Sequence, residues 1–160
     1  MRGKVKLKHG EDYYIKVLLG ETKIVEIMTR DPVCLKEGDP FRDVPRKFRE
    51  HNIRHLPVVD KQNKLVGLVS ERDLFRILPP RKMEDGTFYY DPEALNAIIL
   101  KHVMNPKPCY MHEDEPIGAT LEKFVENKYG GIPILDKDRV LKGIITPVDI
   151  LKVAWQIYRE

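Results

Sequence analysis

The stretch Gly143-Ile144-Ile145-Thr146-Pro147-Val148-Asp149 predicts a buried strand that runs directly into a helix. Its two isoleucines are apolar and β-branched, which favours a strand. Thr146 suits the N-cap of a helix, and Pro147 suits the first helical position. The junction would present a hydroxyl and free backbone N–H groups, with Asp149 one turn further on, and so favours a polyol or an anion. Capped strand–helix junctions are common, so this stretch alone is weak evidence for a site.

The same pattern occurs 76 residues earlier, in Gly67-Leu68-Val69-Ser70-Glu71-Arg72-Asp73. The offset also relates residues outside this stretch, such as Met28 and Met104. No insertion or deletion separates residues 28–73 from residues 104–149, and 13 of these 46 positions are identical. The chain therefore contains a duplicated unit of about 50 residues. Two copies are too few for a solenoid, which favours a closed pair that buries a shared face.

The composition limits the class of protein. The chain has 160 residues, of which 42% are hydrophobic and 33% charged. No apolar run is long enough to span a bilayer, and the N-terminus lacks the apolar core of a signal peptide, so we expect a cytoplasmic protein without membrane contact. The net charge of +3 is carried by residues 1–23. The remainder is neutral, which argues against nucleic-acid binding through the body of the protein, although the basic arm offers phosphate contacts.

Four segments follow along the chain. Residues 1–22 predict a short N-terminal strand or hairpin arm, with a turn at His9-Gly10-Glu11-Asp12 and a second strand from Tyr13 to Leu19. Residues 23–79 predict strand, helix, strand, strand and helix, and residues 100–160 predict the same order. Residues 80–99 predict an ordered spacer, because its aromatic residues are unusual in a mobile linker and Asp91-Pro92 begins a helix. The predicted fold class is α+β.

Two of the predicted helices carry further expectations. Asp39-Pro40 would cap and begin the first helix of repeat one, and Pro45 would then fall inside that helix and remove a hydrogen bond. The last helix, from Thr146 to about residue 159, is apolar over more than one face. We therefore expect this helix to contact something besides its own core, with Trp155 and Ile157 as anchors.

The two copies resemble a tandem pair of CBS domains, often called a Bateman module. The resemblance rests on five runs: Met28 to Val33, Leu56 to Asp60, Gly67 to Asp73, Ile132 to Asp136 and Gly143 to Asp149. It covers residues 23–79 and 100–154, and no run outside the pair indicates an appended enzyme, transporter or DNA-binding domain. The resemblance implies two strand-helix-strand-strand-helix repeats, packed as a pseudo-twofold pair.

The resemblance also implies a ligand and its site. Pairs of this family bind adenosine-containing ligands such as AMP, ADP, ATP or S-adenosylmethionine in clefts between the repeats. By this resemblance, one cleft combines Thr146 and Asp149, which would hold the ribose, with Thr29, Val33, Ile53, Arg54 and His55. The other cleft combines Ser70 and Asp73 with Asn105, Cys109, Tyr129, Gly130 and Gly131. A carboxylate can accept hydrogen bonds from both ribose hydroxyls, and the adjoining helix start favours the phosphates.

The two clefts differ before the proline of each repeat, where Arg54-His55 corresponds to Gly130-Gly131. Cations at the first pair would bind a phosphate, the guanidinium bidentately, whereas glycines offer only their backbone. We therefore expect the cleft that combines this pair with Asp149 to bind a phosphorylated ligand more tightly. A purely structural interpretation is also open, in which Ser70 and Thr146 are ordinary N-caps and the aspartates complement the helix dipoles.

These observations favour a regulatory sensor that binds an adenosine-containing ligand and passes its state to a protein partner, without catalysis. The resemblance and the apolar last helix together predict a homodimer. Two alternatives stay open, a protein-interaction scaffold with vestigial clefts and a nucleic-acid-associated protein that uses the basic arm. No P-loop, catalytic triad spacing or carboxylate pair indicates an enzyme. Cys34 and Cys109 lie in apolar runs without metal-ligand spacing, which indicates buried small hydrophobic residues.

Overall fold

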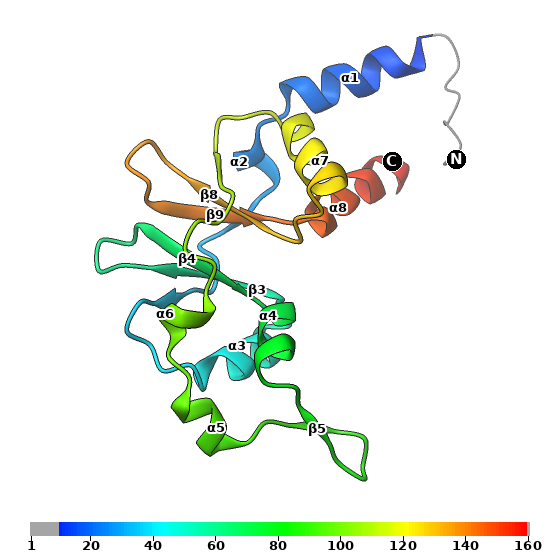
Figure 1. The fold of residues 1–160 in the computed structure, drawn as a ribbon. Coiled ribbons are helices and arrows are strands. Elements are labelled where there is room, and N and C mark those ends of the chain that lie inside the picture. The colour runs from blue at the N-terminus through cyan, green and yellow to red at the C-terminus, as the bar shows by residue number, and fades with distance from the viewer. Residues whose placement is uncertain (1–9, 160) are drawn as a thin grey trace.

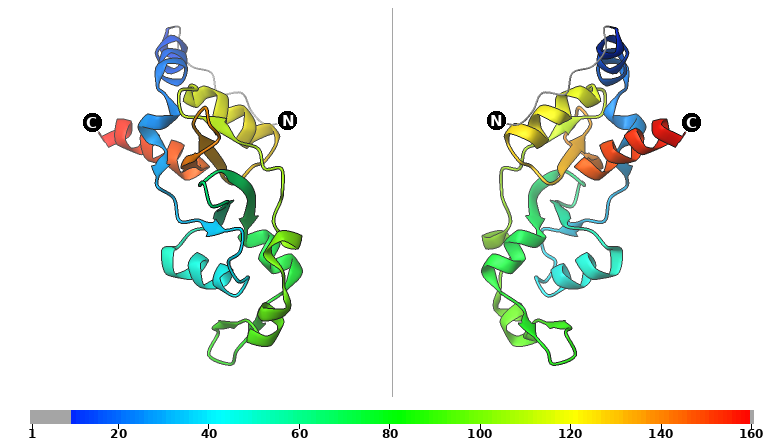
Figure 2. Two further views of the ribbon diagram at one scale, coloured as in Figure 1. Left: turned by 90° about the vertical axis from the view of Figure 1, so that its left-hand side faces the viewer. Right: turned by 90° about the vertical axis from the view of Figure 1, so that its right-hand side faces the viewer.

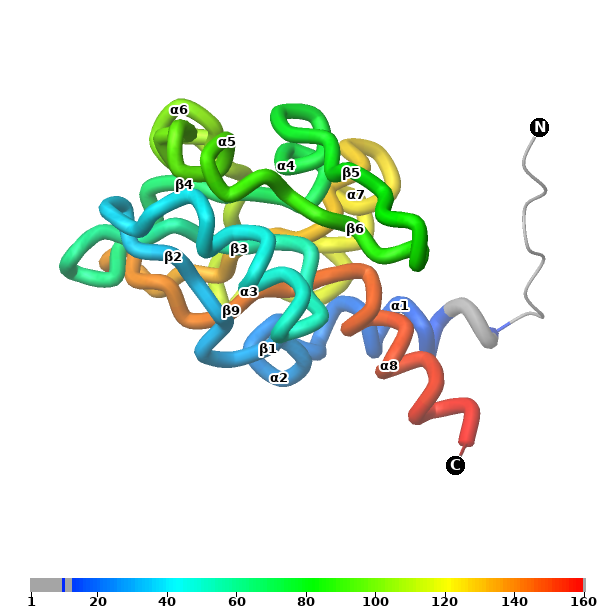
Figure 3. Tube along the Cα trace, turned by 90° about the horizontal axis from the view of Figure 1, so that it is seen from below, coloured from blue at the N-terminus to red at the C-terminus, as the bar shows by residue number. Residues whose placement is uncertain are grey.

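The computed structural model describes residues 10–159, which form two similar halves stacked one above the other (Figure 1). Each half places a small sheet toward the middle of the molecule and its helices on the outside (Figure 2). The view along the stack shows the strands of the two halves overlapping (Figure 3). This arrangement allows the two sheets to bury apolar surface against each other.

The first repeat has the predicted order of elements. They are β2 (Leu35–Lys36), α3 (Asp43–His51), β3 (His55–Val59), β4 (Leu65–Ser70) and α4 (Glu71–Ile77). The sheet has the order β2-β3-β4, with β2 parallel and β4 antiparallel to β3. Burial alternates along β4, where Leu65, Gly67 and Val69 are buried, as a strand with one covered face requires.

The second repeat has the same order. Its elements are β7 (Met111–His112), α7 (Ile117–Glu126), β8 (Ile132–Leu135), β9 (Leu141–Ile145) and α8 (Pro147–Arg159). Its sheet has the order β1-β9-β8-β7, and the additional strand β1 (Thr29–Arg30) comes from the segment that leads into the first repeat. The predicted α+β fold with two strand-helix-strand-strand-helix repeats is therefore confirmed.

The segment that leads into each repeat pairs with a strand of the other repeat. Thr29 of β1 lies opposite Ile144 in β9. In the corresponding place, the backbone N–H groups of Asn105 and Leu68 each donate to the other residue's carbonyl oxygen, at 2.9 and 3.1 Å. The repeats are thus interlocked, and separating them would break backbone hydrogen bonds in both sheets.

The close approach of the leading segments explains why β4 and β9 each contain a glycine, Gly67 and Gly143. A side chain at Gly67 would lie 2.5 Å from Sδ of Met104 and 3.2 Å from the backbone oxygen of Asn105. Gly143 is covered in the same way by Met28. The repeated glycines therefore allow the lead of one repeat to approach the strand of the other closely.

The segment between the repeats contains a hairpin and two short helices. They are β5 (Arg81–Lys82), β6 (Phe88–Tyr89), α5 (Pro92–Ala97) and α6 (Leu100–Val103). The carboxylate of Asp91 caps α5 by accepting a hydrogen bond from the backbone N–H of Glu93 at 2.9 Å, which confirms the predicted helix start. Helix α5 ends at Ala97, and the chain is extended at Ile98 and Ile99 before α6 begins.

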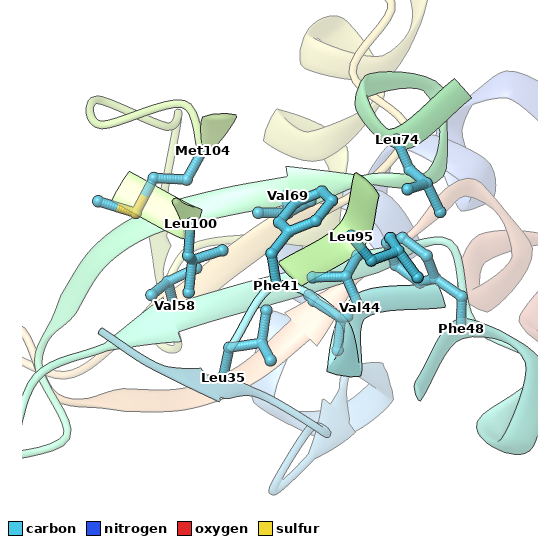
Figure 4. Close-up of a cluster of buried hydrophobic side chains, with 11 residues drawn as sticks. Leu35, Phe41, Val44, Phe48, Val58, Val69, Leu74, Leu95, Leu100 and Met104 are labelled. Atoms are coloured by element: carbon cyan, nitrogen blue, oxygen red, sulfur yellow. The ribbon is translucent and has the colours of Figure 1, made fainter. Parts of the chain in front are cut away.

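Three groups of buried apolar side chains hold the elements together. The largest lies in the first repeat (Figure 4) and comprises Leu35, Phe41, Val44, Phe48, Leu56, Val58, Val69, Leu74, Leu95, Leu100 and Met104. The second surrounds Ile24 of the short helix α2 (Ile24–Ile27) and Ile132 of β8. A third group joins the two sheets and consists of Val59, Leu65, Leu135 and Leu141. This last group is the shared face that the duplication predicted.

The predicted N-terminal hairpin arm is wrong where the structure describes it. The segment from Tyr13 to Leu19 was expected as a strand but lies in helix α1 (Glu11–Glu21), and the first expected strand lies outside the described residues. The helix packs on α7, where a side chain at Gly118 would meet the backbone oxygen of Leu19 at 3.0 Å. Tyrosine, isoleucine and valine favour strands in isolation, but tertiary packing overrides that preference here.

The first long helix of repeat one begins later than predicted. It starts at Asp43 rather than Pro40, because Asp39 instead accepts a hydrogen bond from the backbone N–H of Lys36 at 2.9 Å and closes a turn. Pro45 is therefore the third helical residue, where a backbone N–H would have no intrahelical partner. The expected loss of a hydrogen bond does not occur. Cys34 and Cys109 are both free and half-buried.

Candidate functional site

The hydroxyl and carboxylate of the second repeat form a closed cap at the start of α8. Asp149 is buried, with 5% of its surface exposed. Its Oδ2 accepts hydrogen bonds from both the backbone N–H and the Oγ1 of Thr146, each at 2.8 Å. Its Oδ1 accepts from Nζ of Lys152 at 3.2 Å. A ribose hydroxyl would therefore have to share or replace these donors.

The first repeat has the same cap at the start of α4. Oδ2 of Asp73 accepts from the backbone N–H of Ser70 at 3.0 Å and from its Oγ at 2.6 Å. The same Oγ accepts from the backbone N–H of Asp73 at 3.2 Å, and Arg76 donates to Oδ1 at 3.0 Å. Each aspartate thus has one oxygen held by the cap and one that accepts a hydrogen bond from an exposed cation, which makes the two candidate half-sites chemically alike.

The leading segments bring further expected residues to these caps. Thr29 lies opposite Ile144, two residues before Thr146, and Asn105 is bonded to Leu68, two residues before Ser70. Each candidate half-site is thus flanked by the leading segment of the other repeat. That these two residues contact a ligand stays a prediction. Three other expected residues lie partly buried: Val33 and Ile53 pack against the core of the first repeat, and Cys109 is half-buried.

Arg54 and His55 lie beside the cap of their own repeat. His55 pairs with Ser70 across β3 and β4, and the carbonyl oxygen of Arg54 accepts from the backbone N–H of Glu71 at 2.9 Å. The guanidinium is 81% exposed and lies 3.7 Å from the Glu71 carboxylate. Strand pairing within the repeat thus places both residues beside the start of α4. Their grouping with Asp149 stays a prediction.

The ring of His55 lies against the two glycines of the other repeat. A methyl group on Gly130 would lie 2.7 Å from Cε1 and Nε2 of this ring, and one on Gly131 would lie 2.9 Å from Cγ. Under the offset of 76, Gly131 is the position that corresponds to His55. Equivalent positions touch only where they lie close to the axis that relates the repeats. One imidazole fills this place, and glycine in the other repeat leaves room for it.

The surroundings of this imidazole disfavour its charged form. Burial lowers the pKa of His55 below its ordinary value of 6.5, and the positive charges of Arg54 and Arg72 lower it further, whereas Asp73 opposes them. The sequence interpretation treated His55 as a cation for a phosphate. In the structure, Arg54 is the exposed member of the pair.

Sequence reasoning missed one cavity. It has a volume of about 270 Å³ and lies beside β1, lined by Met28, Arg30, Asp31, Glu113 and Lys142. Two cations and two carboxylates line it, so it has no net preference for an anion. Its residues come from the leading segment of the first repeat and, in the second repeat, from strand β9 and the turn after β7. No local sequence pattern brings them together.

Among residues 10–159, no group of three or more histidine, cysteine or acidic side chains is arranged to hold a metal ion. No helix in this part of the chain combines the length and apolarity needed to cross a membrane.

Comparison with known proteins supports the duplicated architecture. Residues 24–80 and 100–155 each match the CBS domain family. The chain is similar to homoserine O-acetyltransferase from Methanohalobium evestigatum, with 30% identity over 148 residues and 92% of this chain. It is also similar to inosine-5'-monophosphate dehydrogenase from Methanocaldococcus jannaschii, with 30% identity over 130 residues and 81% of this chain. The chain spans only 27% and 23% of the length of these two enzymes.

The fold is similar to that of a solved pair. The CBS domain pair of protein MJ0100, determined in complex with 5'-methylthioadenosine and S-adenosyl-L-methionine, matches with a TM-score of 0.68 and 25% identity. The match covers 84% of this chain and 97% of that chain. The helix α1 and the β5–β6 hairpin lie outside the two family matches.

Proposed function

This chain belongs to the CBS domain family through two tandem repeats, and we propose that it is a regulatory module that binds an adenosine-containing ligand. The observation that carries the proposal is the pair of hydroxyl–carboxylate caps, each joined to the leading segment of the other repeat. The similar pair of MJ0100 was solved with two adenosine-containing molecules, which supports the same ligand class here.

The proposed ligand residues are those that surround the two caps. They are Thr146, Asp149 and Thr29 at one cap, Ser70, Asp73, Asn105, Arg54 and His55 at the other, and Val33, Ile53, Cys109, Tyr129, Gly130 and Gly131 around them. A ligand held by both repeats favours the arrangement in which its two half-sites meet, and so acts by population shift. The module would then transmit ligand occupancy to a partner protein and would not itself catalyse a reaction.

Thermal unfolding with candidate ligands tests this proposal. AMP, ADP, ATP and S-adenosylmethionine are compared with GMP, and a ligand at 100 times its Kd should stabilise the fold by about 2.7 kcal/mol. The variant Asp73→Ala/Asp149→Ala serves as the control and should lose the shift. Unchanged melting temperatures with all four adenosine ligands, together with none co-purifying in native mass spectrometry, would favour the scaffold interpretation instead.

We also propose that the module is a homodimer. Five large apolar side chains on α8 are exposed: Val148, Leu151, Trp155, Ile157 and Tyr158. Asp149 is the only buried residue on this helix of 13 residues. Most of the apolar surface of α8 is therefore not covered by residues 10–159. An exposed apolar face of this kind is typical of an interface.

A further inference from the structure

The contact of His55 with the second repeat lies between the two candidate half-sites. On one side, His55 is paired with Ser70, whose hydroxyl belongs to the first cap. On the other side, its ring covers Gly130 and Gly131. Gly131 directly precedes Ile132, and that residue lies opposite Ile145, the neighbour of Thr146 in the second cap. A single imidazole thus touches the backbone that adjoins each half-site.

The second repeat contributes an irregular segment to this contact, in which Gly131 is buried. Residues 127–131 have no regular secondary structure, Lys128 has a positive φ of 57°, and Gly130 is exposed. The side that belongs to the first repeat is a strand, with His55 in a register set by β4. A ligand that fixes the backbone of Gly130-Gly131 would therefore also fix its contact with the His55 ring. The backbone of His55 is itself held by the pairing of β3 with β4.

We propose that the stack of His55 on Gly130-Gly131 couples the two ligand clefts, so that a ligand in one cleft raises the affinity of the other. This inference rests on the proposed adenosine-ligand function. Binding of the first ligand orders the glycine segment, which costs conformational entropy. The second ligand then binds a segment that is already ordered and loses less entropy, so its affinity is higher. The ring transmits this order because it is the side chain that spans from the first cap to the glycines.

Isothermal titration calorimetry on the full chain tests the coupling, with AMP and S-adenosylmethionine as probes. Asp73→Ala and Asp149→Ala each leave one cleft intact, and they report the affinity of the isolated clefts. In the wild-type protein, the second ligand should bind about 5-fold tighter than these isolated affinities predict.

Two variants break the stack from opposite sides. His55→Ala removes the ring, and Gly131→Ala places a methyl group where the ring lies. In both, the coupling should fall to about 2-fold or less, whatever happens to the individual affinities. His51→Ala is the matched control, because His51 is an exposed histidine at the end of α3 in the same repeat, and it should retain the wild-type coupling.

The outcomes separate the inference from its premise. Two occupied clefts with equal coupling in wild type and His55→Ala would overturn the inference and leave the proposed function intact. Binding at one cleft only, or independent binding in wild type, would also overturn it. Absence of binding by either probe would overturn the inference together with the proposed function.

Discussion

Replacing Gly130 with alanine probes the packing between the repeats directly. The new methyl group would lie 2.7 Å from Cε1 and Nε2 of His55, closer than side-chain carbons approach such atoms in folded proteins. Overpacking of this kind costs about 1–3 kcal/mol. The smaller freedom of the unfolded chain offsets about 0.4–1 kcal/mol of this, since Gly130 does not have a positive φ. We therefore expect Gly130→Ala to lower the free energy of unfolding by about 1–2 kcal/mol.

Urea unfolding followed by circular dichroism measures this change. In a thermal scan of a chain of this length, the melting temperature should correspondingly fall by about 2–8 °C. Gly38→Ala is the control, because no atom lies within 4 Å of its new methyl group and its φ is not positive. This control should be neutral or more stable by up to about 1 kcal/mol.

The ring itself is tested by a double-mutant cycle. In a His55→Ala background the methyl group on Gly130 has room, so the same substitution should cost less than in wild type. The interaction energy in the cycle should be at least about 0.5 kcal/mol. Equal stability of Gly130→Ala and Gly38→Ala, or strict additivity with His55→Ala, would refute the reasoning.

Three further predictions concern pH, the caps and the exposed helix. Because burial lowers the pKa of His55 below 6.5, the unfolded state takes up its proton first. The free energy of unfolding should thus decrease as the pH falls through 6.5. In urea unfolding between about pH 7.5 and 5.5, this decrease should be smaller for His55→Gln than for the wild-type protein. Asp149→Ala should lower the free energy of unfolding by about 1–2 kcal/mol, because its carboxylate accepts from Thr146, and should weaken ligand binding by about 1.5–3 kcal/mol. Unaltered affinity in calorimetry would remove Asp149 from the ligand site. Trp155→Ser should shift a dimer toward monomer in light scattering, since the indole is 57% exposed in the single chain; a wild-type monomer at all micromolar concentrations would contradict the homodimer.

The capping prediction for Asp149 also corrects an expectation drawn from the sequence. The sequence interpretation gave the cap to Thr146, and it assigned Asp149 to the ribose or to the helix dipole. In the structure, the carboxylate accepts from both the backbone N–H and the hydroxyl of Thr146, and it is buried. Burial makes these hydrogen bonds costly to lose, because the donors left behind have no substitute partner.

Much of the fold was readable from local patterns. The duplication at an offset of 76, the order of elements in each repeat and the cap at Ser70 all appear in the structure as the sequence indicated. Such features depend on residues a few positions apart, through strand alternation, apolar spacing on helices and side-chain caps. The two hydroxyl–carboxylate pairs could be named for the same reason, since each spans only four residues.

Only the tertiary structure decided which surfaces meet. It made a helix of the segment from Tyr13 to Leu19, because packing against α7 outweighed the strand preference of its side chains. It also placed the imidazole of His55 against Gly130-Gly131. His55 and Gly131 lie 76 positions apart in the sequence. A contact between such distant residues depends on how two folded surfaces pack together, and a pattern of neighbouring residues cannot predict it.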